Sequence, residues 1–239
     1  SVLILVCFWF SNIFVQEPEE YLSIRSTMQS YFDSGETLPV SARIEHLIKL
    51  KKTILQWEDR LYEACMKDLG KSSFETYETE IGIVQAEISH TLRHLKKWAK
   101  PKRVPTPLAH FPSSSYIIRQ PKGVVLVMSP WNYPIQLSLV PLACALGAGC
   151  CVLLKPSRYS QNVSSVLKQM LESCFDPALV SVVEGGHQAN TDLLQLRWDH
   201  IFFTGSPAVG KIVMEAAARQ LCPVTLELGG KSPCIIDET

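Results

Sequence analysis

The spacing of apolar residues along the chain changes near residue 101. From Glu17 to about Pro101, apolar residues recur at three- and four-residue intervals with charged residues between them. This spacing is typical of amphipathic helices. It predicts one helix over Ala42–Lys71, with Gly70 as its stop, and another over Glu78–Lys100, which the prolines of PKRVPTP end.

After this proline-rich connector the pattern becomes one of short apolar runs. Tyr116–Arg119 is a strand-like segment, followed by a turn at Pro121–Gly123. Val124–Met128 is a continuous apolar run, as expected of a strand that is buried on both faces. Further strands are predicted within residues 150–157, 179–186, 200–206 and 223–230, and helices over residues 160–175, with Ser160 as N-cap, and 207–221.

The alternation of strands and helices predicts the fold class. Over more than a hundred residues it indicates an α/β fold with a Rossmann-like parallel sheet, covered by helices on both faces. An N-terminal helical region precedes this sheet.

Composition and charge exclude some classes of partner. The chain has 239 residues, of which 46% are hydrophobic and 19% charged, as in an ordinary folded protein. Lysine plus arginine equals aspartate plus glutamate, 23 each, so the formal net charge is zero. Because no bulk field favours a polyanion, we expect no nucleic-acid partner.

The cysteines and histidines show no metal or disulfide pattern. The eight cysteines form no CxxC pair and mostly lie in apolar runs, so we expect reduced core thiols. No histidine lies in an H-E-x-x-H motif or beside paired cysteines. We therefore expect no metal site.

The first residues form an apolar segment of uncertain status, residues 1–16. Val2–Val15 is strongly apolar, but it is shorter than the roughly 20 residues of a membrane-spanning helix. It also lacks the positive charges that precede a signal-peptide core. Three interpretations stay open: the remains of a signal or anchor, a buried strand or helix, and sequence outside the mature protein, of which we favour the last.

Polar and glycine-rich motifs follow the predicted strands. They read SPWNYP, KPSRYS, EGGH, FTGSPAVG and ELGGKSP. Ligands of parallel sheets bind at the carboxyl ends of strands, where these motifs would lie. GSPAVG alone is weak evidence for a phosphate site, because the G-x-G-x-x-G spacing is missing.

Four of these motifs together resemble one family. PWNYP, KPS, FTGSPAVGK and LELGGKSP, in this order and at these intervals, resemble the aldehyde dehydrogenase superfamily, and most closely its class 3 or fatty-aldehyde branch. The resemblance runs from about Ser23 to Asp237. It implies NAD or NADP as coenzyme, a small-molecule aldehyde as substrate and a homodimer in the complete enzyme. It also implies a cytoplasmic protein or one associated with the endoplasmic reticulum membrane, and membrane association stays open.

The resemblance also implies a domain organisation. Residues 17–112 would be N-terminal helices of the coenzyme-binding domain, and residues 113–122 a strand of a dimerisation hairpin. Residues 123–239 would be the NAD(P)-binding Rossmann-like domain. The catalytic domain would be absent, which makes this an incomplete aldehyde dehydrogenase fold.

Two residues match catalytic positions of the family. Asn132 matches the asparagine that binds the oxyanion formed when a thiolate attacks the aldehyde; from sequence alone it could equally form an Asx-turn. Glu227 matches the general base that activates water for thioester hydrolysis. We expect burial to raise the pKa of this carboxyl and make it a better base. The alternative for Glu227 is a surface residue on an edge strand.

Other residues match the coenzyme site. Lys155 would hydrogen-bond the adenosine ribose hydroxyls, or be a solvated lysine, and Trp131 would line the substrate side or belong to the core. Gly210 would allow close packing of helix and sheet. The full predicted coenzyme-binding set is Trp131, Lys155, Ser157, Arg158, Thr204, Gly205, Ser206, Gly210 and Leu228.

The sequence departs from the family pattern in two ways. Arg158 stands directly after KPS, where the family usually carries a glutamate that repels a 2′-phosphate. A guanidinium can bind phosphate instead, so we expect NADP to be accepted at least as well as NAD. In addition, the nucleophilic cysteine of the family lies later than Thr239, and no cysteine present replaces it. We therefore expect that the chain alone does not oxidise aldehydes.

Two interpretations of this second departure remain. The chain is either the amino-terminal part of a full aldehyde dehydrogenase, which we favour, or a short inactive product that acts as a coenzyme-binding or dimer-interfering module. The full-length coding sequence would discriminate between them.

Overall fold

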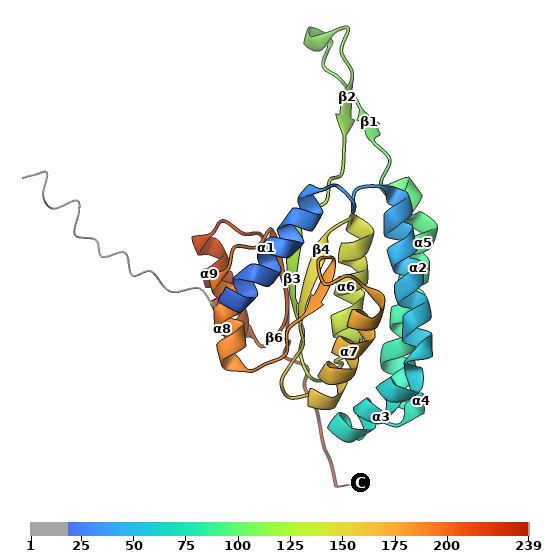
Figure 1. The fold of residues 1–239 in the computed structure, drawn as a ribbon, viewed down its shortest axis with the longest axis vertical. Helices are drawn as coiled ribbons and strands as arrows, with labels where there is room; N and C mark the ends of the chain where they lie inside the picture. The colour runs from blue at the N-terminus through green and yellow to red at the C-terminus, as the bar shows by residue number, and fades with distance from the viewer. Residues whose placement is uncertain (1–18, 239) are drawn as a thin grey trace, which may run out of the picture.

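A five-stranded parallel sheet forms the centre of the fold in the computed structural model, which describes residues 19–238 (Figure 1). Its strands lie in the order β5-β4-β3-β6-β7. All five residues of β3 and of β4 are buried, which explains their continuous apolar sequence. The strands are β3 (Val124–Met128), β4 (Cys151–Lys155), β5 (Val180–Val182), β6 (His200–Gly205) and β7 (Val224–Leu228).

Helices cover both faces of this sheet (Figure 1). The chain runs from β3 to β5 through α6 (Gln136–Ala148) and α7 (Gln161–Cys174), then returns through α8 (His187–Gln195) to β6 and leaves in the other direction through α9 (Pro207–Arg219). Right-handed crossovers that run in opposite directions place their helices on opposite faces. The predicted fold class is confirmed.

The N-terminal region adds further helices. α1 (Glu19–Asp33) contacts β3 and β4, while α2 (Val40–Gln56) and α5 (Gly82–Trp98) pack on α6, and α3 (Glu58–Leu69) packs on α7. A short helix α4 (Ser73–Thr76) and a π-helical turn η1 (Tyr77–Ile81) lead into α5.

The prediction of a single helix over Ala42–Lys71 was wrong. Trp57, with φ −104° and ψ 7°, interrupts it between α2 and α3. Apolar residues continue at helical spacing on both sides of Trp57, so periodicity carries no sign of a one-residue break. The predicted stop at Gly70 is confirmed, because this residue caps α3 with a left-handed conformation at φ 69°.

Two helices that connect strands of the sheet were not predicted, α6 and α8. α6 is apolar all round, because it lies between the sheet on one side and α2 and α5 on the other, so it lacks an amphipathic period. At Gly147 a Cβ atom would lie 3.1 Å from Thr91 Cγ2, which shows how closely α6 approaches α5.

Ser160 occupies the N-cap position of α7, but its side chain does not cap the helix. Its hydroxyl donates to the Ser157 carbonyl at 3.4 Å instead. Asp68 of α3 takes over the capping role, since its carboxylate accepts the backbone N–H groups of Asn162 at 3.2 Å and Val163 at 2.8 Å. A cap from a residue so distant in sequence leaves no local motif.

A two-stranded hairpin projects from the body of the molecule (Figure 1). β1 (Lys102–Val104) pairs antiparallel with β2 (Ser115–Ile117), and the loop between them contains a 3-10 turn, η2 (Leu108–His110). The predicted strand at Tyr116–Arg119 is thus shifted to Ser115–Ile117. Its partner β1 lies in the predicted proline-rich connector, where the prolines of PKRVPTP obscure a strand of three residues.

Most of the described cysteines are buried thiols. Seven cysteines are described, all of them free; five are buried, while Cys144 and Cys234 are exposed, so the expectation of core thiols was wrong for those two.

Within residues 19–238, no helix has both the length and the apolar character needed to cross a bilayer. Val2–Val15 lies outside the described residues.

Candidate functional site

The predicted site residues gather at the carboxyl edge of the sheet. Met128, the last residue of β3, has Lys155 of β4 as its register partner on one side and Phe203 of β6 on the other. Thr204 of β6 is in turn the register partner of Glu227 of β7. Successive strands are added to one side of β3 as far as β5 and to its other side from β6 on, and such a switch point in strand order opens a crevice for ligands.

Asn132 lies on the turn that joins β3 to α6, here called the Asn132 turn (Ser129–Ile135). Both Trp131 and Asn132 are exposed, so the core alternative for Trp131 is wrong. The Asn132 carbonyl oxygen accepts a hydrogen bond from Lys71 Nζ at 2.9 Å. Sequence reasoning missed Lys71, because a contact across 61 residues leaves no local pattern.

Lys155 ends β4 as a buried cation with a 3% exposed side chain. Its Nζ donates to the Pro156 carbonyl at 2.7 Å, and it has no carboxylate within ion-pair distance among residues 19–238. Burial, and to a lesser extent the charge of Arg158, lower the pKa of Lys155 to about 8, against the opposing effect of Glu184. The alternative of a solvated lysine is wrong.

A cavity of about 450 Å³ opens beside Lys155, at the ends of β4 and β5. Its walls include Ser157, Arg158, Glu184 and Gly186. Arg158 is exposed, its guanidinium lies 4.9 Å from the Tyr159 ring centroid, and Nη2 donates to Tyr159 Oη at 3.0 Å. This cavity thus combines the Arg158 guanidinium with a carboxylate and hydroxyl oxygens, which suits a polyhydroxylated or phosphorylated ligand.

Thr204 and Gly205 end β6, and Ser206 joins this strand to α9. Ser206 is the N-cap of α9, and its Oγ accepts the Val209 N–H at 3.3 Å. Thr204 Oγ1 is buried and has no hydrogen-bond partner within the described part of the chain. A Cβ atom on Gly205 would lie 2.5 Å from the buried Phe203 ring, which accounts for glycine there.

Gly210 lies against the last strand. A Cβ atom on Gly210 would lie 2.8 Å from Leu228 Cδ2, so the glycine allows α9 and β7 to approach closely, as predicted. Leu228 itself is 43% exposed, with one side on Gly210 and the other open.

The expected burial of Glu227 was wrong. Its side chain is exposed, because β7 is the outer strand of the sheet and, within residues 19–238, no other element covers this side chain. The flanking leucines are not buried around it, since Leu226 is half-buried and Leu228 is exposed. The residue nevertheless lies at the predicted edge, opposite Thr204.

A groove between α8 and α9 was missed, because α8 itself was not predicted. It has a volume of about 480 Å³ and is lined by Met128, Asn190, Leu194, Val209 and Ile212, among others. Asn190 Oδ1 is buried and lacks a hydrogen-bond partner in the described structure. The surface of the groove is mainly apolar, which suits a flat heteroaromatic group, and its polar lining includes the unpartnered Asn190 amide oxygen and the Glu215–Arg219 ion pair.

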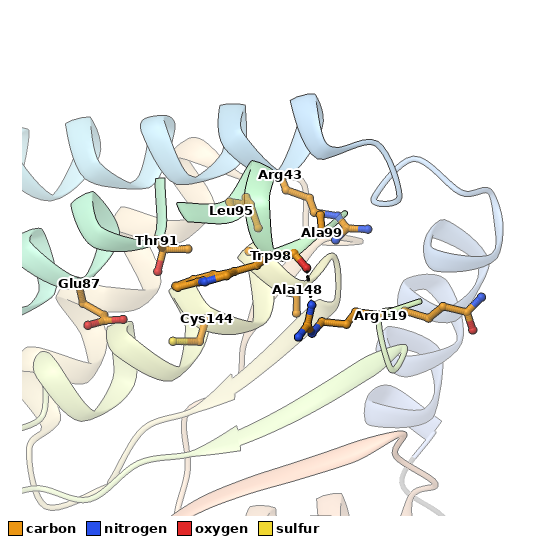
Figure 2. A pocket seen from close by; sticks show the side chains of 11 residues that line it. Arg43, Glu87, Thr91, Leu95, Trp98, Ala99, Arg119, Cys144 and Ala148 are labelled. Carbon is orange, nitrogen blue, oxygen red and sulfur yellow. Dashed lines mark hydrogen bonds between the residues drawn. The ribbon is translucent and has the colours of Figure 1, made fainter. Parts of the chain in front are cut away.

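A larger cavity of about 550 Å³ lies away from this edge, between α5 and α6 (Figure 2). Trp98 and the Cys144 thiol line it, and Arg119 Nη1 donates across its end to the Trp98 carbonyl at 2.9 Å. None of the predicted site residues belongs to it, so we assign the functional site to the carboxyl edge. Among residues 19–238 there is no cluster of three or more metal-ligating side chains.

Comparison with known proteins identifies close relatives. Residues 12–239 match the profile of the Aldehyde dehydrogenase family. Aldehyde dehydrogenase family 3 comG of Dictyostelium discoideum is 48% identical over 216 residues, which are 90% of this chain and 46% of the relative. Human aldehyde dehydrogenase family 3 member B1 is 47% identical over 211 residues, 88% of this chain and 45% of the relative.

Solved structures give the same result. The substrate-bound state of Staphylococcus aureus AldH superposes with a TM-score of 0.88 at 44% identity, over 92% of this chain and 48% of that one. The NAD+ complex of aldehyde dehydrogenase from Bacillus cereus gives a TM-score of 0.79 at 27% identity, over 92% of this chain and 45% of that one. The chain thus spans about half the length of the relatives it matches.

The fold, the motifs at its carboxyl edge and these matches agree. The chain belongs to the aldehyde dehydrogenase family.

Proposed function

We propose that this chain forms the coenzyme-binding part of an NAD(P)-dependent enzyme that oxidises an aldehyde to a carboxylic acid through a thiohemiacetal and a thioester. The observation that carries this proposal is the gathering of the Asn132 turn, Lys155 and Thr204–Ser206 at one edge of the sheet. Because the chain spans about half of each relative, the reaction of the whole enzyme is part of the proposal.

The residues at this edge fit a dinucleotide. When bound, NAD or NADP supplies the hydride acceptor of the reaction. Ser157 lines the 450 Å³ cavity and offers a donor to ribose hydroxyls, and Glu184 in the same lining can accept from them. Lys155, buried directly before the lining residue Pro156, is the proposed second donor. The groove between α8 and α9 suits the adenine base. The amino-terminal end of α9, at Ser206, would stabilise the negative charge of the pyrophosphate.

The catalytic roles rest on Asn132 and Glu227. In the proposed reaction a thiolate adds to the aldehyde carbonyl carbon, and Asn132 donates its neutral carboxamide N–H to the oxygen that gains the charge. After hydride has left, water attacks the thioester, and Glu227 accepts a proton from that water. Trp131, exposed beside Asn132, would line the substrate side.

Arg158 supports acceptance of NADP. Its guanidinium lies at the mouth of the 450 Å³ cavity, where the family usually carries a glutamate. A 2′-phosphate on the ribose would meet the Arg158 guanidinium beside one carboxylate, Glu184, while Lys155 lies buried next to the lining residue Pro156. We therefore propose that NADP binds at least as tightly as NAD.

The hairpin supports a homodimer in the complete enzyme. It projects from the body, and its apolar side chains are exposed, with Leu108 at 88%, Phe111 at 81% and Ile118 at 63%. Exposed apolar groups on a projecting arm are typical of an interface between subunits. Mass measurement by light scattering on the complete enzyme would test this part of the proposal.

Equilibrium binding of coenzyme to the 239-residue chain tests the central proposal. We expect NAD and NADP each to bind with one site per chain in a calorimetric titration. Lys155→Met should weaken both, whereas Lys51→Met on the distant helix α2 should not. Absence of binding to the folded wild-type chain, or equal binding by Lys155→Met, would overturn the proposal.

A further inference from the structure

Glu80 is a carboxylate that lies entirely inside the protein, with 0% of the residue exposed. Its Oε1 lies 2.8 Å from Lys71 Nζ, and Lys71 is itself only 9% exposed. Breaking a buried ion pair strongly destabilises a protein, and replacing both partners with apolar groups is often neutral or stabilising. Stability alone therefore does not explain why this pair is present, and its contacts point to another role.

Both members of the pair contact the segment that carries Asn132. Lys71 Nζ donates to the Asn132 carbonyl at 2.9 Å and lies 3.9 Å from the Tyr133 ring centroid. Glu80 Oε2 accepts the backbone N–H groups of Ile135 at 2.7 Å and Gln136 at 3.2 Å. The pair thus holds the turn from both sides of Asn132 and Tyr133.

The contacts of Glu80 occur at the start of α6. The first N–H groups of a helix lack partners within the helix, and the helix dipole favours an anion there. The N-cap residue Ile135 has an apolar side chain, which accepts no hydrogen bond from these N–H groups. Glu80 therefore fixes where α6 begins, and with it the direction in which the Asn132 turn leaves β3.

A π-helical turn directs Glu80 inward. The Gly82 N–H bonds to the Tyr77 carbonyl, five residues earlier, and this wide turn places both Glu80 and Ile81 in the interior. A Cβ atom on Gly82 would lie 2.9 Å from the Tyr77 carbonyl oxygen, so glycine permits this close approach. An ordinary α-helical register would rotate Glu80 away from α6.

We propose that Lys71 and Glu80 are positioning residues that hold the Asn132 carboxamide in its place at the carboxyl edge of the sheet. Neither residue contacts the reacting atoms in this arrangement. The inference rests on the proposed function, because the position of Asn132 matters for catalysis only if Asn132 binds the oxyanion.

Nuclear magnetic resonance on the ¹⁵N-labelled 239-residue chain tests the placement directly. Asn132→Ala identifies the side-chain NH₂ signal of Asn132. We expect Lys71→Met to move or broaden this signal, and Glu80→Gln to speed the hydrogen exchange of the Ile135 and Gln136 amides roughly tenfold or more, as expected for the loss of a charge-assisted hydrogen bond. Lys51→Met is the matched control, since Lys51 Nζ donates to Ser89 Oγ at 2.6 Å far from the turn and should change neither.

The double variant Lys71→Met/Glu80→Gln separates positioning from stability. It leaves no unpaired buried charge, so its urea midpoint should exceed that of each single variant, while the Asn132 signal stays displaced. An Asn132 side-chain signal at the wild-type position in the double variant would overturn the inference. If a single variant does not fold, the signal is measured in the double variant alone. Coenzyme binding is measured separately, so a wild-type chain that binds no coenzyme would contradict the proposed function and leave the placement test intact.

Discussion

Gly210 of α9 and Leu228 of β7 meet so closely that a Cβ atom on Gly210 would lie 2.8 Å from Leu228 Cδ2. The contact brings the start of α9 against the outer strand of the sheet, next to Ser206 and Glu227. Because Gly210 has no side chain, the amino-terminal end of α9 can pack close to the strand that carries the proposed base, Glu227.

A larger side chain at position 210 should loosen this contact. We expect Gly210→Val to lower the free energy of unfolding by about 1–3 kcal/mol, because a branched side chain overpacks the space that Leu228 fills. Adding Leu228→Ala in the same chain should recover most of the loss, since it removes the group that the valine meets. Urea unfolding of the wild type, the two single variants and the double variant measures these free energies. A double variant that is no more stable than Gly210→Val would show that the valine clashes with atoms other than those of Leu228.

Lys155 should make stability depend on pH in the alkaline range. Its pKa in the folded chain is lowered to about 8 from 10.5, mainly by burial, so the unfolded chain binds more protons between these values. The sign follows: wild-type stability rises from pH 8 towards pH 10.5, relative to Lys155→Met, by about 3 kcal/mol at most. Chemical unfolding of both proteins across this range tests it, and parallel curves would contradict the lowered pKa.

The sheet could be predicted from sequence because its strands carry their signal locally. Val124–Met128 reads as a doubly buried strand from its own residues, and so does Cys151–Lys155. Motif spacing located Asn132, Lys155 and Ser206 at strand ends, where the structure has them. These features depend on neighbours within a few positions.

Other features depend on contacts between distant residues and could not be predicted. Lys71 reaches Asn132 across 61 residues, and Asp68 caps α7 across more than 90. The exposure of Glu227 depends on what covers β7, which the residues around it do not encode. α6 carries apolar residues on all sides, including the exposed Cys144 and Ala148, so its sequence has no amphipathic spacing that would predict a helix.

The described thiols should react in two groups. Cys144 and Cys234 are exposed and should be alkylated in the folded chain, while Cys65, Cys150 and Cys151 should react only after unfolding. Although Cys144 is exposed as a residue, the protein around its sulfur desolvates the thiolate; this desolvation, and then the charge of Glu87, raise the pKa of the Cys144 thiol, so its alkylation should speed up as the pH rises above the ordinary pKa of a thiol. Peptide mass spectrometry after timed iodoacetamide treatment gives the rates, with Cys144→Ser as control. Fast labelling of Cys151 in the native chain would contradict the structure.

Reversing the charge of Arg158 should change coenzyme preference. Arg158→Glu restores the residue type that the family usually carries, and it should weaken NADP binding by roughly tenfold to a hundredfold, because a charge-assisted contact to the 2′-phosphate is replaced by repulsion. NAD lacks that phosphate, so its dissociation constant should change much less. Arg93→Glu, on the exposed face of α5 and outside both proposed coenzyme cavities, is the matched control for net charge. Calorimetric titration of both coenzymes measures the ratio, and a wild-type chain that already prefers NAD strongly would show that Glu184, rather than Arg158, governs the ribose end of the cavity.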